Sequence, residues 1–239
     1  MAWRGSVGSE WIKLWSMRST WWSLASAVVL MVACAAAVGA SFAHDVAAGA
    51  ARGRTSMAIG EPAMNGVLLA QFAVVAFAMA VMTTEFATGA IRVTLTADPR
   101  RGRVLIAKTV VVVAVTVPLG LLLAVSGVGI GRFTLGSAGV GEGRAMARDI
   151  VVITAYLVLT AMTTVGVAAV VRGALPTLST VLVVMLLLPV FVTARAGEYL
   201  PGGAGSKLLE GHAAAGATLA AWAFAAQLAG WRVLRRRDV

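Results

Sequence analysis

Residues 85–108 read EFATGAIRVTLTADPRRGRVLIAK and connect two long apolar stretches of the chain. This connecting segment is basic, with five cationic side chains: Arg92, Arg100, Arg101, Arg103 and Lys108. Positively charged residues between membrane spans favour the cytoplasmic side, so the segment is predicted to face the cytoplasm. We therefore expect a cytoplasmic partner to act here, while the surrounding apolar stretches hold the segment in place.

The composition of the whole chain is that of an integral membrane protein. Of its 239 residues, 59% are hydrophobic and 13% are charged, and the mean hydropathy is +0.89. Soluble proteins have about 45–50% apolar and about 25% charged residues. The net charge of +10 comes from bases that flank apolar stretches rather than alternating with exposed aromatic residues, which favours a membrane over a nucleic acid as the partner.

Six apolar stretches predict six transmembrane helices within a single domain over residues 1–239. Helices are expected even where valine is frequent, because an open strand in lipid leaves its backbone groups unpaired. The predicted spans are residues 21–42, 63–84, 104–127, 150–171, 174–194 and 213–234. With both termini in the cytoplasm, thirteen of the twenty lysines and arginines fall on the cytoplasmic side. The fold class is therefore an all-α, multi-pass membrane protein.

The residues before the first span predict a helix that lies in the membrane interface. Over residues 9–20 an apolar side would be formed by Trp11, Leu14 and Trp15. The charged residues Glu10, Lys13 and Arg18 are expected to point elsewhere. Tryptophan prefers headgroup depth and charges are costly in lipid, so an interfacial helix is favoured over an early start of the first span.

Residues 195–212, RAGEYLPGGAGSKLLEGH, separate the last two predicted spans and are too polar to cross a membrane. Two alternatives stay open. In the first alternative, the segments around Tyr199 and Leu208, on either side of a glycine-rich turn, form two short helices that dip into the outer leaflet. Otherwise the segment is an ordinary exposed loop.

Polar and small residues within the spans indicate contacts between helices. Gln71 and Gln227 are the strongly polar residues of the span interiors, and a hydrogen bond to a neighbouring helix is favoured over contact with a substrate. The last span carries a stripe of small residues that allows close approach of another helix. These residues are Ala213, Ala217, Ala221, Ala225 and Ala229.

The sequence holds no recognisable catalytic, metal or nucleotide site. His44 and His212 fall in predicted outer loops, and Cys34 is the only cysteine. The phosphate-binding pattern G-x-x-x-x-G-K-[ST] does not occur, so the chain is not expected to hydrolyse ATP itself. The spans also lack the charged residues with which ion-coupled carriers bind protons or sodium.

The stretch Glu85–Leu95, EFATGAIRVTL, followed by Pro99, Arg101 and Lys108, resembles the cytoplasmic coupling segment of ABC type-2 exporter permeases. That segment often reads E-Y-x-x-G-T-I-R-x-T-L, then P-x-R and a lysine at the head of the third helix. Residues 10–20, EWIKLWSMRST, are similar to the entry helix of the same family. Phe86 and Ala90 depart from the usual tyrosine and threonine.

The resemblance implies that two permeases, identical or related, sit on two cytoplasmic ATPase subunits, which bind ATP and Mg²⁺. Residues 85–103 would form a short coupling helix that begins at Glu85 and docks on the ATPase. Gly89 would allow a bend or a close backbone approach. The residues implied in this contact are Glu85, Phe86, Gly89, Ile91, Arg92, Leu95, Pro99 and Arg101.

The resemblance also implies short re-entrant helices before the last span and a location in a bacterial plasma membrane. The mostly apolar spans favour a hydrophobic or amphipathic cargo, such as a drug, an antibiotic, a peptide or a lipid. The alternative is a membrane scaffold or immunity protein that binds a ligand without transporting it.

Overall fold

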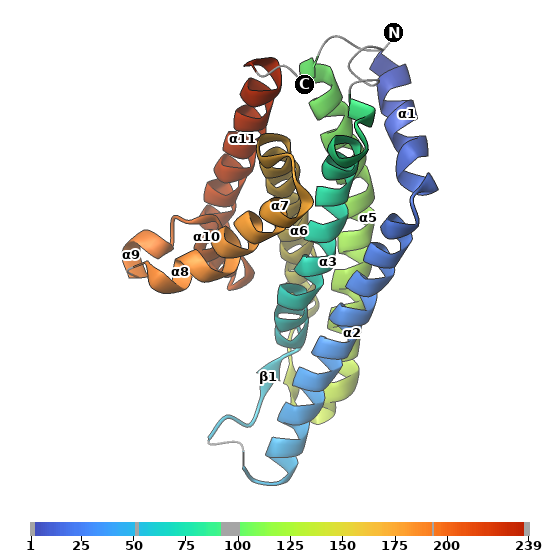
Figure 1. The fold of residues 1–239 in the computed structure, drawn as a ribbon. Helices are drawn as coiled ribbons and strands as arrows, with labels where there is room; N and C mark the ends of the chain where they lie inside the picture. The colour runs from blue at the N-terminus through green and yellow to red at the C-terminus, as the bar shows by residue number, and fades with distance from the viewer. Residues whose placement is uncertain (1–2, 51–52, 92–100, 193, 237–239) are drawn as a thin grey trace.

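A computed structural model describes residues 3–50, 53–91, 101–192 and 194–236. Within these residues, five helices are long and apolar enough to cross a membrane. They are α2 (Arg18–Ala47), α3 (Glu61–Thr88), α5 (Arg101–Leu135), α6 (Gly143–Val171) and α11 (Ala213–Arg236). Figure 1 shows α2, α3, α5 and α6 side by side in an elongated bundle. The expectation of an all-α protein with several long apolar helices is confirmed, and the number of six spans stays a prediction.

These five helices contain the predicted first, second, third, fourth and sixth spans and are longer than predicted. The largest difference is in α5, which continues to Leu135, so residues 128–135 are helical where a loop was predicted. Gly131 on this extension allows it to pack closely on the residues at the start of α3. A Cβ on Gly131 would lie 2.5 Å from the carbonyl oxygen of Ile59. The extension of α5 is therefore packed against the residues that lead into α3.

Residues 174–194, predicted as one span, are interrupted in the structure. They form α7 (Ala174–Leu182), a π-helical turn η2 (Val183–Leu187) and α8 (Leu188–Phe191). The apolar helical stretch 174–187 is shorter than the five long helices. Pro189 has no N–H to donate to the preceding turn, and the hydrogen bonding widens to the π pattern directly before it.

The segment between α8 and α11 is folded as helices and is not an exposed loop. α9 (Ala194–Gly197) and α10 (Pro201–Leu209) follow each other, and α10 packs against α6, α11 and η2. The glycine-rich stretch predicted as a turn lies inside α10. A Cβ on Gly202 would lie 1.9 Å from the carbonyl oxygen of Met185, and one on Gly205 would lie 2.6 Å from the Tyr156 ring. These glycines are therefore required for contact between helices.

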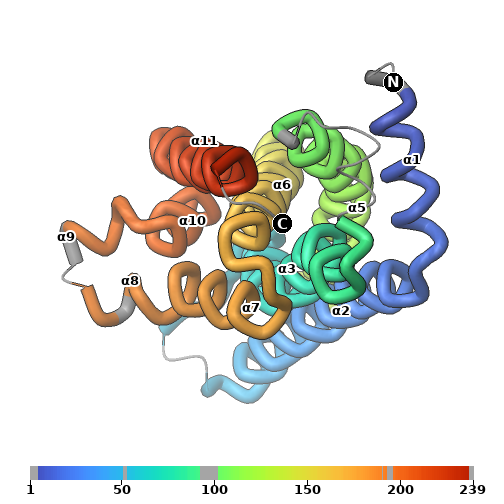
Figure 2. Tube along the Cα trace, turned by 45° about the horizontal axis from the view of Figure 1, so that its top comes forward, coloured from blue at the N-terminus to red at the C-terminus, as the bar shows by residue number. Residues whose placement is uncertain are grey.

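The first helix, α1 (Trp3–Ser16), meets α2 at an elbow formed by Met17, whose backbone is extended. The hydroxyl of Thr20 donates a hydrogen bond to the Leu14 carbonyl across this elbow (2.8 Å). Figure 2 shows α1 beside α2 and α5, whereas α8, α9, α10 and α11 lie on the opposite side of the bundle. The beginning of α1, the end of α3, the beginning of α5 and the end of α11 all lie at one end of the molecule (Figure 1), which we call the α1 end.

At the opposite end, two loops are joined by a short pair of strands. β1 (Met57–Ala58) pairs in parallel with β2 (Gly139–Val140), which follows the 3-10 turn η1 (Gly136–Ala138). This pairing connects the segment before α3 to the segment after α5.

Helix α11 packs on α6 through a different face from the predicted alanine stripe. All five alanines of the stripe are exposed, whereas Ala223 and Gly230 are buried. A Cβ on Gly166 of α6 would lie 2.5 Å from the backbone carbon of Ala226. Gln227 also donates a hydrogen bond to the carbonyl of Met162 on α6 (2.7 Å), which turns this face of α11 toward α6.

Substitution of Gly166 by alanine should separate α11 from α6, because the added methyl group would overlap the α11 backbone. Overpacking of this kind costs about 1–3 kcal/mol in the free energy of unfolding. We expect a lower thermal unfolding midpoint of the purified protein. Gly129→Ala in α5 is the matched control, since nothing lies within 4 Å of its Cβ position. An equal midpoint for both variants would contradict the close α6–α11 contact.

Candidate functional site

Four charged side chains meet where α1, α3 and α5 come together at the α1 end of the molecule. Glu10 and Lys13 come from α1, Glu85 from the last turn of α3 and Lys108 from α5. We call these four residues the charge cluster. Lys108 is 1% exposed, Glu10 is 5% exposed and Glu85 is 8% exposed. Charged side chains this deeply buried are uncommon unless they are paired.

Lys108 is the centre of the charge cluster. Its Nζ lies 2.6 Å from Oε2 of Glu10 and 3.0 Å from Oε1 of Glu85. It also donates a hydrogen bond to the carbonyl oxygen of Val81 (3.2 Å). A lysine ammonium has three N–H donors, so these three acceptors match its full capacity. One side chain of α5 thereby binds both α1 and α3.

Lys13 completes the charge cluster from the surface side. Its Nζ lies 2.9 Å from Oε1 of Glu10 and 2.9 Å from Oε1 of Glu85. Partial burial lowers the pKa of Lys13, but the hydrogen bonds with Glu85 and Glu10 outweigh it, and the pKa is raised overall. Lys13 therefore stays charged at neutral pH, and the stabilisation that it provides is lost only as the pH rises through this raised pKa. Two lysines balance two glutamates.

The sequence predicted that Glu85 begins a short helix, and this prediction is wrong. Glu85 lies inside α3, which continues to Thr88 and ends at Gly89, a left-handed residue with φ of 70°. A carboxylate near a helix C-terminus is disfavoured by the helix dipole, and the two lysines offset this cost. The bend expected at Gly89 is present, and it ends α3 within the basic segment.

The other residues of the predicted coupling segment are only partly described. Ile91 is buried, and Phe86 is half-buried with the guanidinium of Arg172 above its ring. α5 begins at Arg101, of whose side chain nothing is described. The predictions for Arg92, Leu95 and Pro99 lie outside the described residues.

In the predicted interfacial helix, Leu14 is buried and the rings of Trp11 and Trp15 pack edge to face at 5.7 Å. Arg18 is exposed at the start of α2. Glu10, expected away from the apolar side, instead faces the bundle with Leu14. Residues four apart share one face of a helix, and the burial of Leu14 therefore carries Glu10 inward.

The sequence assigned Glu85 to the predicted ATPase contact and Lys13 to the interfacial helix, but it did not predict that they meet Glu10 and Lys108. The signal for Lys108 is its context, VLIAKTVVVV, in which apolar residues stand on both sides of the lysine. A lysine in such a stretch is buried when the stretch packs in a bundle, and it then requires a carboxylate partner. Which carboxylate supplies the charge depends on the tertiary structure, because Glu10 is 98 residues away in the chain.

The two glutamines of the span interiors lie away from the charge cluster, and each bonds across a helix interface. Tyr156 of α6 donates its hydroxyl hydrogen to Oε1 of Gln71 on α3. Thr109 of α5 donates to Oε1 of Gln227 (3.1 Å), whose amide binds α6. Both contacts are of the kind expected for helix packing.

Comparison with protein-family models gives no match, and comparison with curated proteins finds no similar sequence. Within the described part of the chain, no group of three or more histidine, cysteine or acidic residues is arranged to hold a metal ion.

Among the described residues, replacement of Lys108 by methionine should leave Lys13 as the remaining cationic partner of Glu10 and Glu85. Removal of one member of a buried ion pair typically costs about 3–5 kcal/mol, because a buried charge is left uncompensated. We expect a large fall in the thermal unfolding midpoint, partly reversed when Glu10→Gln is added. Lys207→Met is the control, since its ion pair with Glu198 is partly exposed at both ends. Equal midpoints for the two lysine variants would show that the charge cluster does not stabilise the fold.

Proposed function

We propose that this chain is the membrane-spanning permease subunit of an ATP-driven ABC exporter. The observation that carries the proposal is the charge cluster, which ties α1, α3 and α5 together at the first residue of the predicted coupling segment, Glu85. In this proposal two permeases, identical or related, associate with two cytoplasmic ATPase subunits. The ATPases bind ATP and Mg²⁺ and hydrolyse the nucleotide.

The arrangement of the helices around the predicted coupling segment, residues 85–103, suits the transfer of force. The segment is attached to α3 on one side and to α5 on the other, so displacement of the segment acts on both helices. Lys108 links these helices through Glu85 and links both to α1 through Glu10. A buried ion pair held by several hydrogen bonds resists separation more than an exposed pair does. We infer that α1, α3 and α5 respond as one unit when an ATPase moves the segment.

The proposal includes six membrane crossings with both termini in the cytoplasm of a bacterium. The fifth crossing would be made by residues 174–191, which as a helix of 18 residues extend about 27 Å at 1.5 Å per residue. This is close to the hydrocarbon thickness of about 30 Å. α9 and α10 would then form a re-entrant pair on the outer side. The low polarity of the helices suits a hydrophobic or amphipathic cargo.

Gentle purification of the tagged chain from its native host tests the central proposal. We expect a soluble protein with a phosphate-binding loop to co-purify in a fixed ratio. Arg92→Glu in the predicted coupling segment should abolish this association, because it reverses a charge that the ATPase would contact. Arg132→Glu, the same charge reversal at the exposed far end of α5, should leave it intact. If the chain purifies alone even after chemical cross-linking, the exporter proposal is wrong, and a membrane scaffold or immunity protein becomes the favoured function.

The proposed six crossings predict which loops are accessible from outside the cell. In a Cys34→Ala background, Glu210→Cys should react in intact cells with a maleimide that cannot cross the membrane. Gly173→Cys, at the turn between α6 and α7, should react only after the membrane is permeabilised. Position 173 precedes the proposed fifth crossing and position 210 follows it. Labelling of both positions from the same side would therefore show that residues 174–191 do not cross.

A further inference from the structure

The turn between α6 and α7 contains a residue in an unusual backbone conformation. Arg172 caps the C-terminus of α6 with φ of 63°, and its N–H donates to the carbonyl of Ala168 (2.9 Å). Among the described residues it is the only one other than glycine with positive φ. Left-handed backbone is unfavourable for a side chain such as arginine, and glycine normally occupies such a cap. A strained residue of this kind suggests that its side chain has a role.

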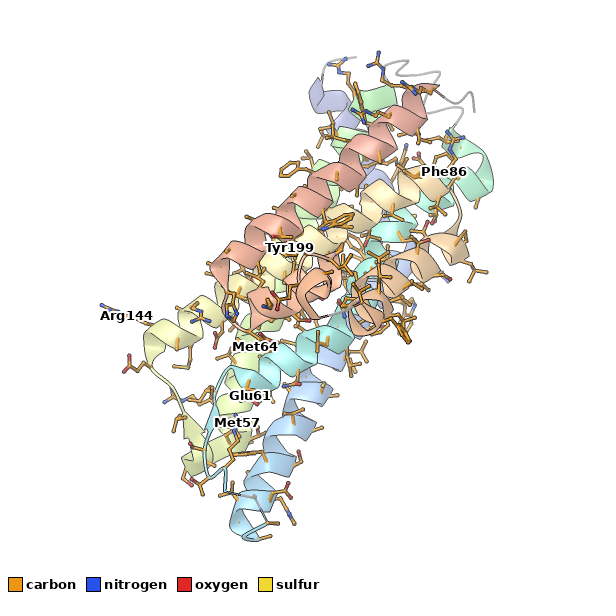
Figure 3. The ribbon with its side chains drawn as sticks, turned by 90° about the vertical axis from the view of Figure 1, so that its left-hand side faces the viewer. Met57, Glu61, Met64, Phe86, Arg144 and Tyr199 are labelled. Carbon is orange, nitrogen blue, oxygen red and sulfur yellow. The ribbon has the colours of Figure 1, made fainter. Side chains whose placement is uncertain are left out.

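The side chain of Arg172 reaches from this turn to the last turn of α3. Its guanidinium carbon lies 5.4 Å from the centroid of the Phe86 ring, within the range of a cation–π interaction. Two of its nitrogen atoms, Nε and Nη2, are buried, so the interaction is shielded from water. Phe86 follows Glu85 of the charge cluster and precedes the bend at Gly89 by three residues. Figure 3 shows Phe86 at the end of α3, close to the beginning of α7.

This contact connects two parts of the molecule that are otherwise organised differently. On one side, α1, α3 and α5 are joined by the charge cluster. On the other side, α7 leads into the π-helical turn η2 and then into α8. A π-helical turn interrupts the regular hydrogen bonding and is common where a helix adjusts its shape for function. The Arg172–Phe86 contact lies between the unit that would receive force and the interrupted helix that would change shape.

We propose that Arg172 is a positioning residue that transmits movement of the coupling segment to α7 through the ring of Phe86. The inference rests on the proposed function. It assigns to the phenylalanine at position 86 a role that a ring face can fill without a hydroxyl group. When α3 moves, the guanidinium follows the ring, and the turn at Arg172 carries α7 with it.

The test measures nucleotide-driven movement in the permease bound to its ATPase, with spin labels in a Cys34→Ala background. A label pair at Ile12→Cys and Phe224→Cys reports the α1–α3–α5 unit relative to α11. A second pair at Ser179→Cys and Phe224→Cys reports α7 relative to α11. All three positions are exposed. In the unaltered protein, a non-hydrolysable ATP analogue with Mg²⁺ should change both distances.

Three substitutions separate the charge of Arg172 from its backbone conformation. Arg172→Gly and Arg172→Asn both tolerate left-handed backbone and remove the cation. Both should keep the change at Ile12–Phe224 and lose the change at Ser179–Phe224. Arg172→Lys retains a cation and should keep both changes. Phe86→Leu should act like Arg172→Gly. The double variant Phe86→Leu/Arg172→Gly should show the same distance changes as either single variant.

Each other result contradicts a definite part of the inference. If Arg172→Gly keeps both distance changes, Arg172 does not transmit movement to α7. If it loses both changes, or loses the ATPase, its role is general to folding and the inference is wrong. If no ATPase co-purifies with the unaltered chain, the proposed function fails, and the inference fails with it.

Discussion

The ammonium group of Lys108 sets the strongest constraint on this structure. It is buried in an apolar helix, where an unpaired charge would be prohibitively costly, and it has three hydrogen-bond donors to satisfy. The acceptors come from two other helices, Glu10 of α1 and Glu85 together with Val81 of α3. The chain bends at Met17, and α1 lies against the end of α3 and the beginning of α5. An apolar contact would not impose such a specific arrangement, because hydrophobic packing is non-directional.

The polar groups of the bundle are distributed unevenly along its length. Ionic contacts between long helices gather at the α1 end. Further along, helices are joined by the neutral pairs of Gln71 with Tyr156 and of Gln227 with Thr109. Small residues bring α11 and α10 into close contact with α6, at Gly166 and Gly205 respectively. Charged groups join the helices at the α1 end, whereas the helical stretch of α7 and α8 is interrupted by the π-helical turn η2.

The outer surfaces of α2 and α11 agree with a lipid environment. Both helices are apolar, and most of each is exposed in the chain by itself. Trp22 and Val29 of α2 and Phe224 and Leu228 of α11 are large exposed apolar residues. In a membrane such side chains contact lipid tails or another membrane protein without the cost that they would have in water.

Several features were determined by the sequence alone. Apolar stretches of about 20 residues predict the positions of the five long helices. A membrane span requires that length, and its backbone groups must be hydrogen-bonded within the helix. Gly89 predicts the bend after α3, since glycine adopts positive φ without strain. These predictions depend on local properties of consecutive residues, which the sequence displays directly.

Other features were decided only by the tertiary structure. The pairing of Glu10 with Lys108 joins residues 98 positions apart, and no local pattern identifies the partner. The glycines of residues 201–209 read as a turn but form a helix, because they pack against Met185 and Tyr156. The alanine stripe of α11 faces outward because Gln227 binds α6 from another face. In each case the outcome depends on which surface another helix presents, and that surface exists only once the chain has folded.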